Sequence, residues 1–459
     1  MNPTRRKFVR QTATGAAALT IAPFSASKSF ATSAKSYNRI LGANDRVRVG
    51  IVGFSNRFRG SLLKSFLNHN EEMNFELVAV SDIWNRRREE AVGVVKELTG
   101  LDIKACRNNE ELYDTVQDLD AVIISTADFQ HALHCVQAVR AGCDAYVEKP
   151  LAETMEDNRA ALEAVKETGK IVQIGSQRRS GRNYWAAYDF IKSGKFGDIT
   201  MVNMTWNVNQ PGRWRRADLV ASIKESDVDW KRYQMNRPPT KWDPRKYLEY
   251  RLFWPYSSGI PGQWMSHQID TVHWFSGFSH PRSVAANGGI YMWNDGRSNF
   301  DTMTAVFDYG PADKKAEGFQ VVYSSRMHNS AGGTKEIYYS NGGTLDLKNN
   351  LISPDGGLKE RHASAMNMEP NLLAEMSLTE MAEAVNTDAN TGADNTTSNH
   401  MRNWMECVRS RKKPNAPIEA GYSHSIANIM TTASLRTGKR VTFDEDVQEV
   451  MAGEEIFVY

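Results

Sequence analysis

The sequence predicts an α/β fold in two parts, a parallel sheet with helices first and a strand-rich part after it. From residue 46 to residue 174, short apolar strand patterns alternate with helix patterns. Repeated strand–helix units of this kind form a parallel sheet through right-handed crossovers. After residue 174 strand patterns dominate, and residues 202–208 alternate apolar and polar side chains as in a sheet with one buried face.

Length, charge and cysteine content exclude several classes of protein. A chain of 459 residues exceeds one ordinary domain, so we expect two domains with additional segments. The formal net charge of +2 gives no electrostatic reason to expect nucleic acid or an anionic membrane as a partner. The four cysteines lack metal-ligand spacing, so we expect no metal site. Beyond the N-terminal leader, no stretch is apolar enough for stable membrane insertion.

Residues 1–34 have the order of a twin-arginine export signal. Arg5 and Arg6 lie in a basic stretch, a mildly apolar stretch follows, and small residues allow cleavage after Ala31 or Ala34. The alternative is a disordered basic tail. An export signal of this type predicts a periplasmic protein that crosses the membrane already folded, with its cofactor in place.

The elements of the first part follow in a regular order. They are a strand at 46–53, a helix beginning at 61–68, a strand at 76–81, a helix at 86–98, a strand at 121–125 and a helix at 130–140. A further strand at 145–147 ends on Glu148, Lys149 and Pro150. The carboxyl ends of strands in an open α/β sheet are where ligands bind, so Lys149 can reach a substrate there. The alternative is an ordinary charged loop.

The loop after the first strand is an imperfect dinucleotide fingerprint. In Gly-x-Gly-x-x-Gly the glycines let the backbone approach a pyrophosphate at a helix N-terminus. Here Gly53 stands at the first glycine position, whereas Ser55 and Phe58 occupy the second and third. Together with Asn56 and Arg57, these residues are our candidates for cofactor binding in the loop.

Asp82 ends the next strand, at the position where an acid holds the adenosine ribose. A carboxylate there repels a 2′-phosphate and therefore favours NAD over NADP. Arg86 and Arg87 follow closely and keep NADP open. The alternative role of Asp82 is to cap the following helix.

An ordered set of motifs carries a family resemblance. The motifs lie at 49–60, 125–131, 148–150, 175–179, 254–259, 267–270 and 403–420. Together they resemble the Gfo/Idh/MocA family of glucose-fructose oxidoreductases and inositol dehydrogenases, over almost all of residues 46–445. The resemblance implies an N-terminal Rossmann domain that binds NAD(P) at 46–174. It implies a C-terminal α/β domain at 175–445 with a large, mostly antiparallel open sheet, which binds substrate and forms a homo-oligomer.

The resemblance also implies roles for residues outside the glycine loop. It places Thr126, His131, Glu148, Lys149 and Gln177 at the cofactor. It makes Lys149 and His267 the catalytic pair, one as the base and the other as a hydrogen-bond donor. Its substrate-binding candidates are Gln263, Asp270, Arg178 and Tyr256.

Each of these roles has a structural alternative. Gln263, His267 and Asp270 are spaced to share one helix face. Gln263 stands where family members commonly carry an aspartate beside this histidine. His267 alone could be a satisfied interior histidine, and Arg178 a solvated arginine. Trp206, Trp214 and Tyr256 could stack on sugar rings or pack in the core.

The predicted reaction is oxidation of a secondary hydroxyl group of a sugar, glycoside or cyclic polyol, a small-molecule carbohydrate substrate. The insertion at 210–258 is rich in Trp and Arg, which agrees with such a substrate. One alternative is an NAD-dependent oxidative glycoside hydrolase, although relatives of that kind tend to lack the lysine at Lys149. The other is a non-catalytic sugar-binding protein, which only the altered glycine loop supports.

Overall fold

The residues that the computed structural model describes are 45–311, 313, 317–381 and 394–459. The candidate export signal at 1–34 lies outside them. Within these ranges, no helix is both long enough and apolar enough to cross a membrane.

Six parallel strands form the N-terminal sheet, in the order β3–β2–β1–β4–β5–β6. They are β1 (Val47–Val52), β2 (Phe75–Ser81), β3 (Lys104–Cys106), β4 (Ala121–Ile124), β5 (Asp144–Val147) and β6 (Val172–Ile174). The strand order reverses between β1 and β4, and open sheets bind ligands at such a switch point. The predicted parallel sheet is confirmed.

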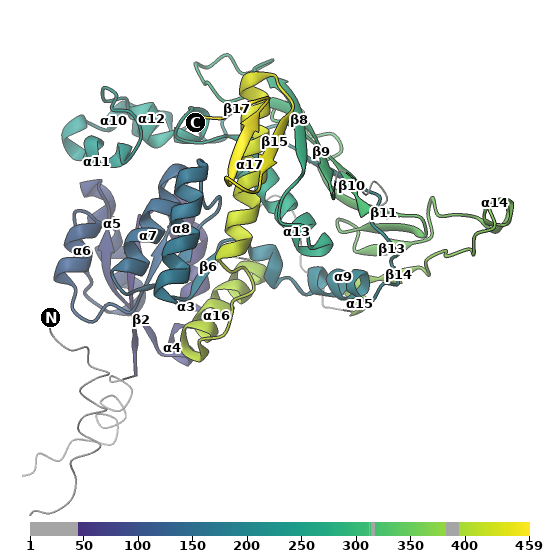
Figure 1. Ribbon diagram of the computed structural model, residues 1–459. Coiled ribbons are helices and arrows are strands. Elements are labelled where there is room, and N and C mark those ends of the chain that lie inside the picture. Colours follow the sequence, from purple (N-terminus) through teal and green to yellow (C-terminus); the bar gives the residue numbers. More distant parts are fainter. Residues whose placement is uncertain (1–44, 312, 314–316, 382–393) are drawn as a thin grey trace, which may run out of the picture. The chain divides into compact units, whose positions relative to one another are not determined.

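Helices cover both faces of this sheet (Figure 1). One face carries α6 (Asn109–Thr115), α7 (His131–Arg140) and α8 (Met155–Thr168). The other carries α3 (Leu63–Leu67), α5 (Asn85–Thr99) and α16 (Asn395–Ser410), and the short α4 (Asn70–Met73) precedes β2.

The helix α16 changes the predicted domain limits. Its Trp404 ring lies 5.9 Å from the ring of Phe75 and 6.1 Å from that of Tyr146, centroid to centroid. The hydrophobic core at 46–174 is therefore completed by a helix some 220 residues further along the chain. No local pattern could reveal this packing, because it joins segments that are distant in sequence.

Eleven strands form the second sheet, in the order β14–β13–β12–β11–β7–β10–β9–β8–β15–β16–β17. They are β7 (Met201–Asn207), β8 (Ser283–Gly289), β9 (Thr302–Tyr309), β10 (Phe319–Arg326), β11 (Thr334–Ser340), β12 (Gly343–Asp346), β13 (Leu351–Ser353), β14 (Met376–Ser377), β15 (Val441–Asp444), β16 (Glu449–Ala452) and β17 (Glu455–Ile456). Only β7 and β10 pair in parallel among these strands. The predicted mostly antiparallel sheet is confirmed, and it runs past residue 445 to Ile456.

Three helices pack on the inner face of the second sheet: α9 (Arg182–Lys192), α13 (Ser266–Ser276) and α17 (Ile418–Thr437). The short helices α14 (Glu360–Ala365) and α15 (Leu378–Met381) lie at its β12–β14 end (Figure 1). A π-helical turn, Pro261–Met265, leads directly into α13. This turn brings the start of α13 to the carboxyl edge of the first sheet.

The insertion at 210–258 folds back over the first sheet. It contains α10 (Ala217–Ser222), α11 (Trp230–Gln234) and α12 (Pro244–Leu248), which lie above α5, α6 and α7 in Figure 1. Val228 forms a β-bridge with Trp84, and the amide of Asp229 donates to the carbonyl of Ile83 at 3.2 Å. The insertion therefore covers the edge where ligands of such a sheet bind.

Candidate active site

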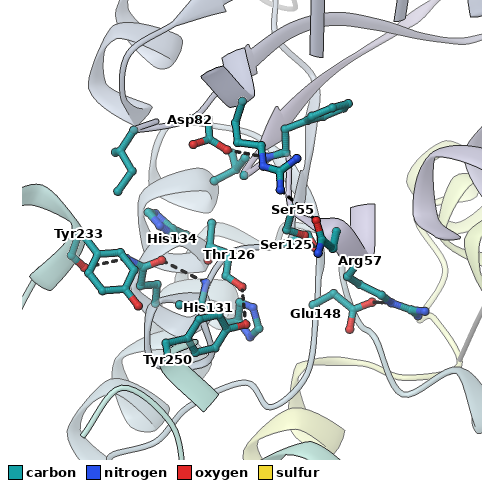
Figure 2. A pocket seen from close by; sticks show the side chains of 18 of the residues that line it. Ser55, Arg57, Asp82, Ser125, Thr126, His131, His134, Glu148, Tyr233 and Tyr250 are labelled. Carbon is teal, nitrogen blue, oxygen red and sulfur yellow. Dashed lines mark hydrogen bonds and ion pairs between the residues drawn. The ribbon is translucent and has the colours of Figure 1, made fainter. Parts of the chain in front are cut away.

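A cavity of about 1040 Å³ lies between the carboxyl edge of the first sheet and the insertion. Its wall runs from Gly53 and Asp82 at one end to Lys149 and His267 at the other. Figure 2 shows part of this wall, with side chains from the ends of β1, β2, β4 and β5 directed toward one space. We call the part beside Asp82 the nucleotide end and the part beside His267 the sugar end.

The backbone of the glycine loop approaches the next strand closely at Gly53. This residue has φ +86, and a Cβ there would lie 2.7 Å from the Cγ2 of Thr126 and 2.8 Å from the carbonyl oxygen of Ser125. Ser55 holds the loop, because its hydroxyl lies 2.8 Å from that of Ser125 and accepts a hydrogen bond from the amide of Phe58 at 3.2 Å. The serine thus replaces a glycine with a side chain that caps the turn.

The side chain of Phe58 does not line the cavity. It is fully buried, with its ring centroid 5.6 Å from that of Phe54. The phenylalanine at the third glycine position supports the loop from the core, and its expected contact with the cofactor stays a prediction. Asn56 does line the cavity, where its side-chain oxygen accepts hydrogen bonds from Arg59 and Arg87.

Asp82 ties the loop to the end of β2. Its carboxylate accepts hydrogen bonds from the amides of Phe54, at 2.8 Å, and Trp84, at 2.9 Å, while it lines the cavity. Burial raises the pKa of Asp82, and these amides oppose that effect. Helix α5 begins with Trp84 as its N-cap, so Asp82 is not the cap residue itself.

Glu148 and Arg57 form an ion pair on the wall. The Nε of Arg57 donates to Glu148 at 2.9 Å, and its Nη1 donates to the hydroxyl of Ser61 at 3.0 Å. Burial alone would raise the pKa of Glu148, but Arg57 and Lys149 hold it below its usual value. The acid of the Glu148–Lys149–Pro150 motif therefore fixes an arginine of the glycine loop, and the two predicted cofactor residues meet (Figure 2).

Lys149 points toward the turn that precedes α13. Its Nζ donates to the carbonyl of Gln263 at 2.5 Å, and the carbonyl of Gly262 lies at 3.4 Å. Gly262 permits this approach, because a Cβ there would lie 2.7 Å from the hydroxyl of Ser258 and 3.2 Å from the Cγ of Pro150. Burial lowers the pKa of Lys149 to about 7. An amine of this kind can take up a proton near neutral pH.

His267 lines the same cavity as Lys149. Burial, and then the positive charge of Lys149, hold the pKa of His267 well below its usual value, so the imidazole is neutral. Trp206 stacks on the ring, with centroids 5.8 Å apart and an angle of 25° between the planes. The structure therefore brings an amine with a pKa near neutrality and a neutral imidazole to one space.

Gln263 lines the cavity but does not serve His267. Its amide nitrogen donates to Asp128 at 2.5 Å, and its oxygen accepts from the Nε of Arg251 at 2.7 Å. Its side chain makes no hydrogen bond to His267 in the described part of the chain. The interpretation of Gln263 as a replaced partner of the histidine is corrected, since it links Asp128 to Arg251 instead.

Three predicted substrate residues lie outside the cavity wall. Asp270 is buried and accepts two hydrogen bonds from Arg179, at 2.8 and 3.0 Å. Arg178 pairs with Glu336 behind Trp206. Tyr256 is buried in the core, with its hydroxyl 3.0 Å from that of Thr240. The polar groups named here have partners inside the protein, so the structure shows no contact of these residues with the cavity, and their role in substrate binding stays a prediction.

Sequence reasoning missed five residues of the cavity wall, which are Arg213, Arg216, Tyr250, Arg251 and Trp264. It also missed Asp128, which lies behind the wall and accepts a hydrogen bond from Gln263. The only signal in the sequence was the Trp- and Arg-rich composition of the insertion. Trp206 and Trp214, the two tryptophans proposed for stacking, do line the cavity.

Five side chains on the wall carry buried polar atoms without a hydrogen-bond partner among the described residues, and three of these atoms bear on the cofactor. These three are the hydroxyl of Thr126, the Nε2 of His131 and the Oε1 of Gln177. The other nitrogen of His131 lies 2.8 Å from the carbonyl oxygen of Pro150. Buried polar groups are normally paired. These atoms, together with the close approach at Gly53, fit a polar ligand such as a nicotinamide nucleotide.

A family model described as "Oxidoreductase family, NAD-binding Rossmann fold", GFO_IDH_MocA, matches residues 47–176. This match assigns residues 47–176 to the Gfo/Idh/MocA oxidoreductases. It is 37% identical to scyllo-inositol 2-dehydrogenase (NAD(+)) of Bacillus subtilis over 124 residues, 27% of this chain and 34% of that enzyme. It is 25% identical to inositol 2-dehydrogenase of Salmonella typhimurium over 245 residues, 52% of this chain and 68% of that enzyme. The match thus spans about a third of the Bacillus subtilis enzyme and about two thirds of the Salmonella enzyme.

Solved structures share the fold over most of the chain. Levoglucosan dehydrogenase, in complex with NADH and levoglucosan, has a TM-score of 0.61 at 14% identity and covers 86% of this chain and 99% of its own. The WlbA dehydrogenase of Bordetella pertussis, in complex with NADH and UDP-GlcNAcA, has a TM-score of 0.60 at 17% identity. It covers 87% of this chain and 99% of its own. These structures therefore share the fold of this chain, a Rossmann-like parallel sheet followed by a second α/β part with a large sheet.

Proposed function

We propose that this protein is an NAD-dependent oxidoreductase of the Gfo/Idh/MocA family that oxidises a secondary hydroxyl group of a sugar, glycoside or cyclic polyol. The observation that carries this proposal is that Lys149 and His267 line one cavity. The glycine loop that begins at Gly53 lines the same cavity. The dehydrogenases of inositol and levoglucosan among its relatives support this substrate class.

The side chains of the cavity suit the two ends of the reaction. When bound, the nicotinamide of NAD⁺ accepts a hydride from the carbinol carbon. Lys149, with a pKa of about 7, takes the hydroxyl proton onto Nζ while the carbonyl of Gln263 orients the amine. The neutral imidazole of His267 donates a hydrogen bond to the same oxygen and steadies its developing charge. Trp206 holds the plane of the imidazole.

The cofactor preference follows from Asp82. Its carboxylate, at the nucleotide end, disfavours a 2′-phosphate, so NAD is the expected cofactor. Arg87 lines the wall nearby, and NADP is the alternative. A comparison of NAD⁺ and NADP⁺ at equal concentration, by initial rate with one sugar, tests this preference.

The test of the reaction is a sugar panel with the purified protein, followed by nicotinamide absorbance and product analysis. We expect a keto sugar and reduced nucleotide in equal amounts. Release of a free aglycone without net reduction of the nucleotide would instead indicate an oxidative glycoside hydrolase. Binding of sugar without any reduction, in protein saturated with either nucleotide, would indicate a non-catalytic binding protein.

The protein is exported through the twin-arginine pathway to the periplasm and carries its nucleotide with it. Residues 1–34 support this part of the proposal through their sequence. Contacts between the insertion at 210–258 and the first part of the chain support retention of the nucleotide. Arg232 pairs with Glu110 at 2.5 Å, and the side chain of Gln130 donates to the carbonyl of Tyr233 at 2.7 Å. We expect periplasmic protein to hold nucleotide through gel filtration. Nucleotide-free protein that turns over only with freely exchanging NAD⁺ would contradict retention.

The protein also forms a homo-oligomer through the outer face of its large sheet. Half-buried apolar side chains of neighbouring strands meet there, with Val306 of β9 opposite Val322 of β10. Light scattering coupled to gel filtration is the test, and a monomer at all concentrations would contradict this proposal.

A further inference from the structure

Three arginines of the cavity wall have no carboxylate within ion-pair distance among the described residues. Arg213, Arg216 and Arg251 line the cavity, and no acidic side chain in the described ranges lies within ion-pair distance of them. Burial, followed by the charge of Arg251, lowers the pKa of Arg213 and of Arg216. The Nε of Arg213 is buried without a hydrogen-bond partner among the described residues. For Arg251, burial opposes the charge, but Tyr250, Asp128 and Glu148 together raise its pKa. The wall therefore gathers three like charges without an ion pair, and only that of Arg251 is compensated from a distance.

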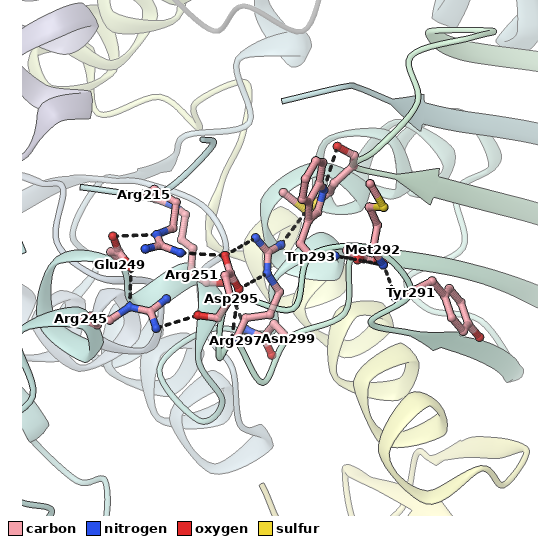
Figure 3. Close-up of polar contacts among 12 residues, drawn as sticks. Arg215, Arg245, Glu249, Arg251, Tyr291, Met292, Trp293, Asp295, Arg297 and Asn299 are labelled. Carbon is pink, nitrogen blue, oxygen red and sulfur yellow. Dashed lines mark hydrogen bonds and ion pairs between the residues drawn. The ribbon is translucent and has the colours of Figure 1, made fainter. Parts of the chain in front are cut away.

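The carboxylates of this region are engaged by other arginines. Glu249 pairs with Arg215 at 3.1 Å and with Arg245 at 2.8 Å. Asp295 pairs with Arg215 at 3.0 Å and with Arg297 at 2.8 Å. Figure 3 shows this chain of ion pairs beside Arg251. The two acids thus form their ion pairs with neighbours of the three cavity arginines and not with those three.

Two of these arginines, Arg213 and Arg251, adjoin the reacting groups. The guanidinium of Arg213 lies 5.3 Å from the centroid of the Trp264 ring, and that ring is parallel to Trp206, with an angle of 4° between the planes. Trp206 in turn stacks on His267. Arg251 donates to the side chain of Gln263, whose carbonyl receives Lys149. An aromatic wall therefore connects the cationic cluster to the catalytic pair.

We propose that the sugar substrate carries an anionic group, a carboxylate or a sulfate ester, which Arg213, Arg216 and Arg251 bind. This inference rests on the proposed function, because it names the substrate class of the same site. Guanidinium groups match the oxygens of such anions in charge and geometry. Buried cations without a partner are costly, so a ligand that neutralises them gains affinity.

The test compares matched sugars by equilibrium binding to the nucleotide-loaded protein, using the fluorescence of the wall tryptophans. The probes are D-glucuronate, D-glucose 6-sulfate and D-glucose. We expect at least one acidic sugar to bind about tenfold or more tightly than glucose. Arg213→Gln and Arg216→Gln should each remove most of this preference while the bound nucleotide stays the same. The glucuronate and sulfate arms identify which anion fits.

A matched control distinguishes the effect of the three cavity arginines from the effect of the protein's net positive charge. Lys224 is an exposed cation on the same insertion and does not line the cavity, so Lys224→Gln should keep the full preference. Failure of both acidic sugars to bind more tightly than glucose would overturn the inference. Loss of nucleotide from the arginine variants, with the acid preference intact, would also overturn it. Binding is measured without turnover, so an acid preference in a protein that never reduces nucleotide would refute the proposed reaction and keep the anion site.

Discussion

The two ends of the cavity treat charge in opposite ways. At the nucleotide end each charged wall residue with an assigned partner is neutralised by the protein, as in the Arg57–Glu148 pair and the pair of Arg87 with Glu90. At the sugar end Arg213 and Arg251 have no acidic partner in the part of the chain that the structure describes. The first end is organised before any ligand arrives, whereas the second is completed by its ligand.

This difference separates the expected effects of mutation. A change at the nucleotide end breaks a pair inside the protein, so it lowers both stability and nucleotide retention. A change at the sugar end removes a cation that forms no ion pair among the described residues, so we expect it to alter specificity more than stability. Lys149 and His267 lie where the two ends meet.

The largest expected effect is on turnover, at Lys149. Lys149→Ala should lower the single-turnover rate of nucleotide reduction by roughly a thousandfold, because general base catalysis contributes factors of this size. The nucleotide content of the purified protein should stay the same, since the loop contacts lie elsewhere. Lys149→Arg is the matched variant: it keeps the charge but cannot lose its proton, so it should be equally inactive. Normal turnover in Lys149→Arg would show that charge alone suffices and that Lys149 is not the base.

The next effect is on stability, at the nucleotide end. Glu148→Gln removes the carboxylate that pairs with Arg57, and breaking such a pair lowers the free energy of unfolding by about 3 kcal/mol. Chemical denaturation measures this loss, and gel filtration measures the nucleotide that is lost with it. Glu97→Gln, an exposed position on α5, is the control and should change neither. An unchanged unfolding free energy in Glu148→Gln would mean that the nucleotide end is not organised by this pair.

The pH dependence of oxidation tests whether Lys149, which lies where the two ends of the cavity meet, is the base. Because burial lowers the pKa of Lys149 to about 7, the fraction of neutral amine rises as the pH rises through 7. The oxidation rate should therefore fall about tenfold per pH unit below 7 and level off above it. His267 remains neutral in this range, since its pKa is held well below the usual value. A rate that decreases as the pH rises through 7 would exclude Lys149 as the base.

The smallest expected effect concerns a residue behind the wall. Tyr256→Phe removes a buried hydroxyl that bonds to Thr240, which costs about 1 kcal/mol of unfolding free energy. The KM for the sugar should stay the same, because Tyr256 does not line the cavity. A several-fold increase in KM with unchanged stability would show that Tyr256 contributes to substrate binding.

The sequence predicts the nucleotide end better than the sugar end for a physical reason. Strand–helix repeats determine which strand ends meet, so the amino-acid sequence alone assigns Glu148 and Lys149 to the ligand-binding edge. The strand pattern at 202–208 is likewise recovered as β7 (Met201–Asn207), because alternation indicates one buried face. These features depend on neighbours along the chain or on rules of topology.

The sugar end depends on contacts between distant segments. Helical spacing correctly puts His267 and Asp270 on α13, but it cannot indicate that Asp270 is taken up by Arg179. In the same way, the composition of the insertion indicates arginines and tryptophans without revealing that Glu249 neutralises Arg215 while Arg213 stays unpaired. Which charge finds a partner is decided by packing, and packing is not local in sequence.

The most direct test of the account is one experiment on protein purified from the periplasm with its own nucleotide. The bound nucleotide is released from one portion and quantified, and a second portion is mixed with acidic and neutral sugars while nicotinamide absorbance is recorded. We predict bound NAD close to one per chain and its reduction by an acidic sugar, absent in Lys149→Ala. Protein that holds no nucleotide, and reduces neither added NAD⁺ nor added NADP⁺ with any of the sugars, would contradict the account.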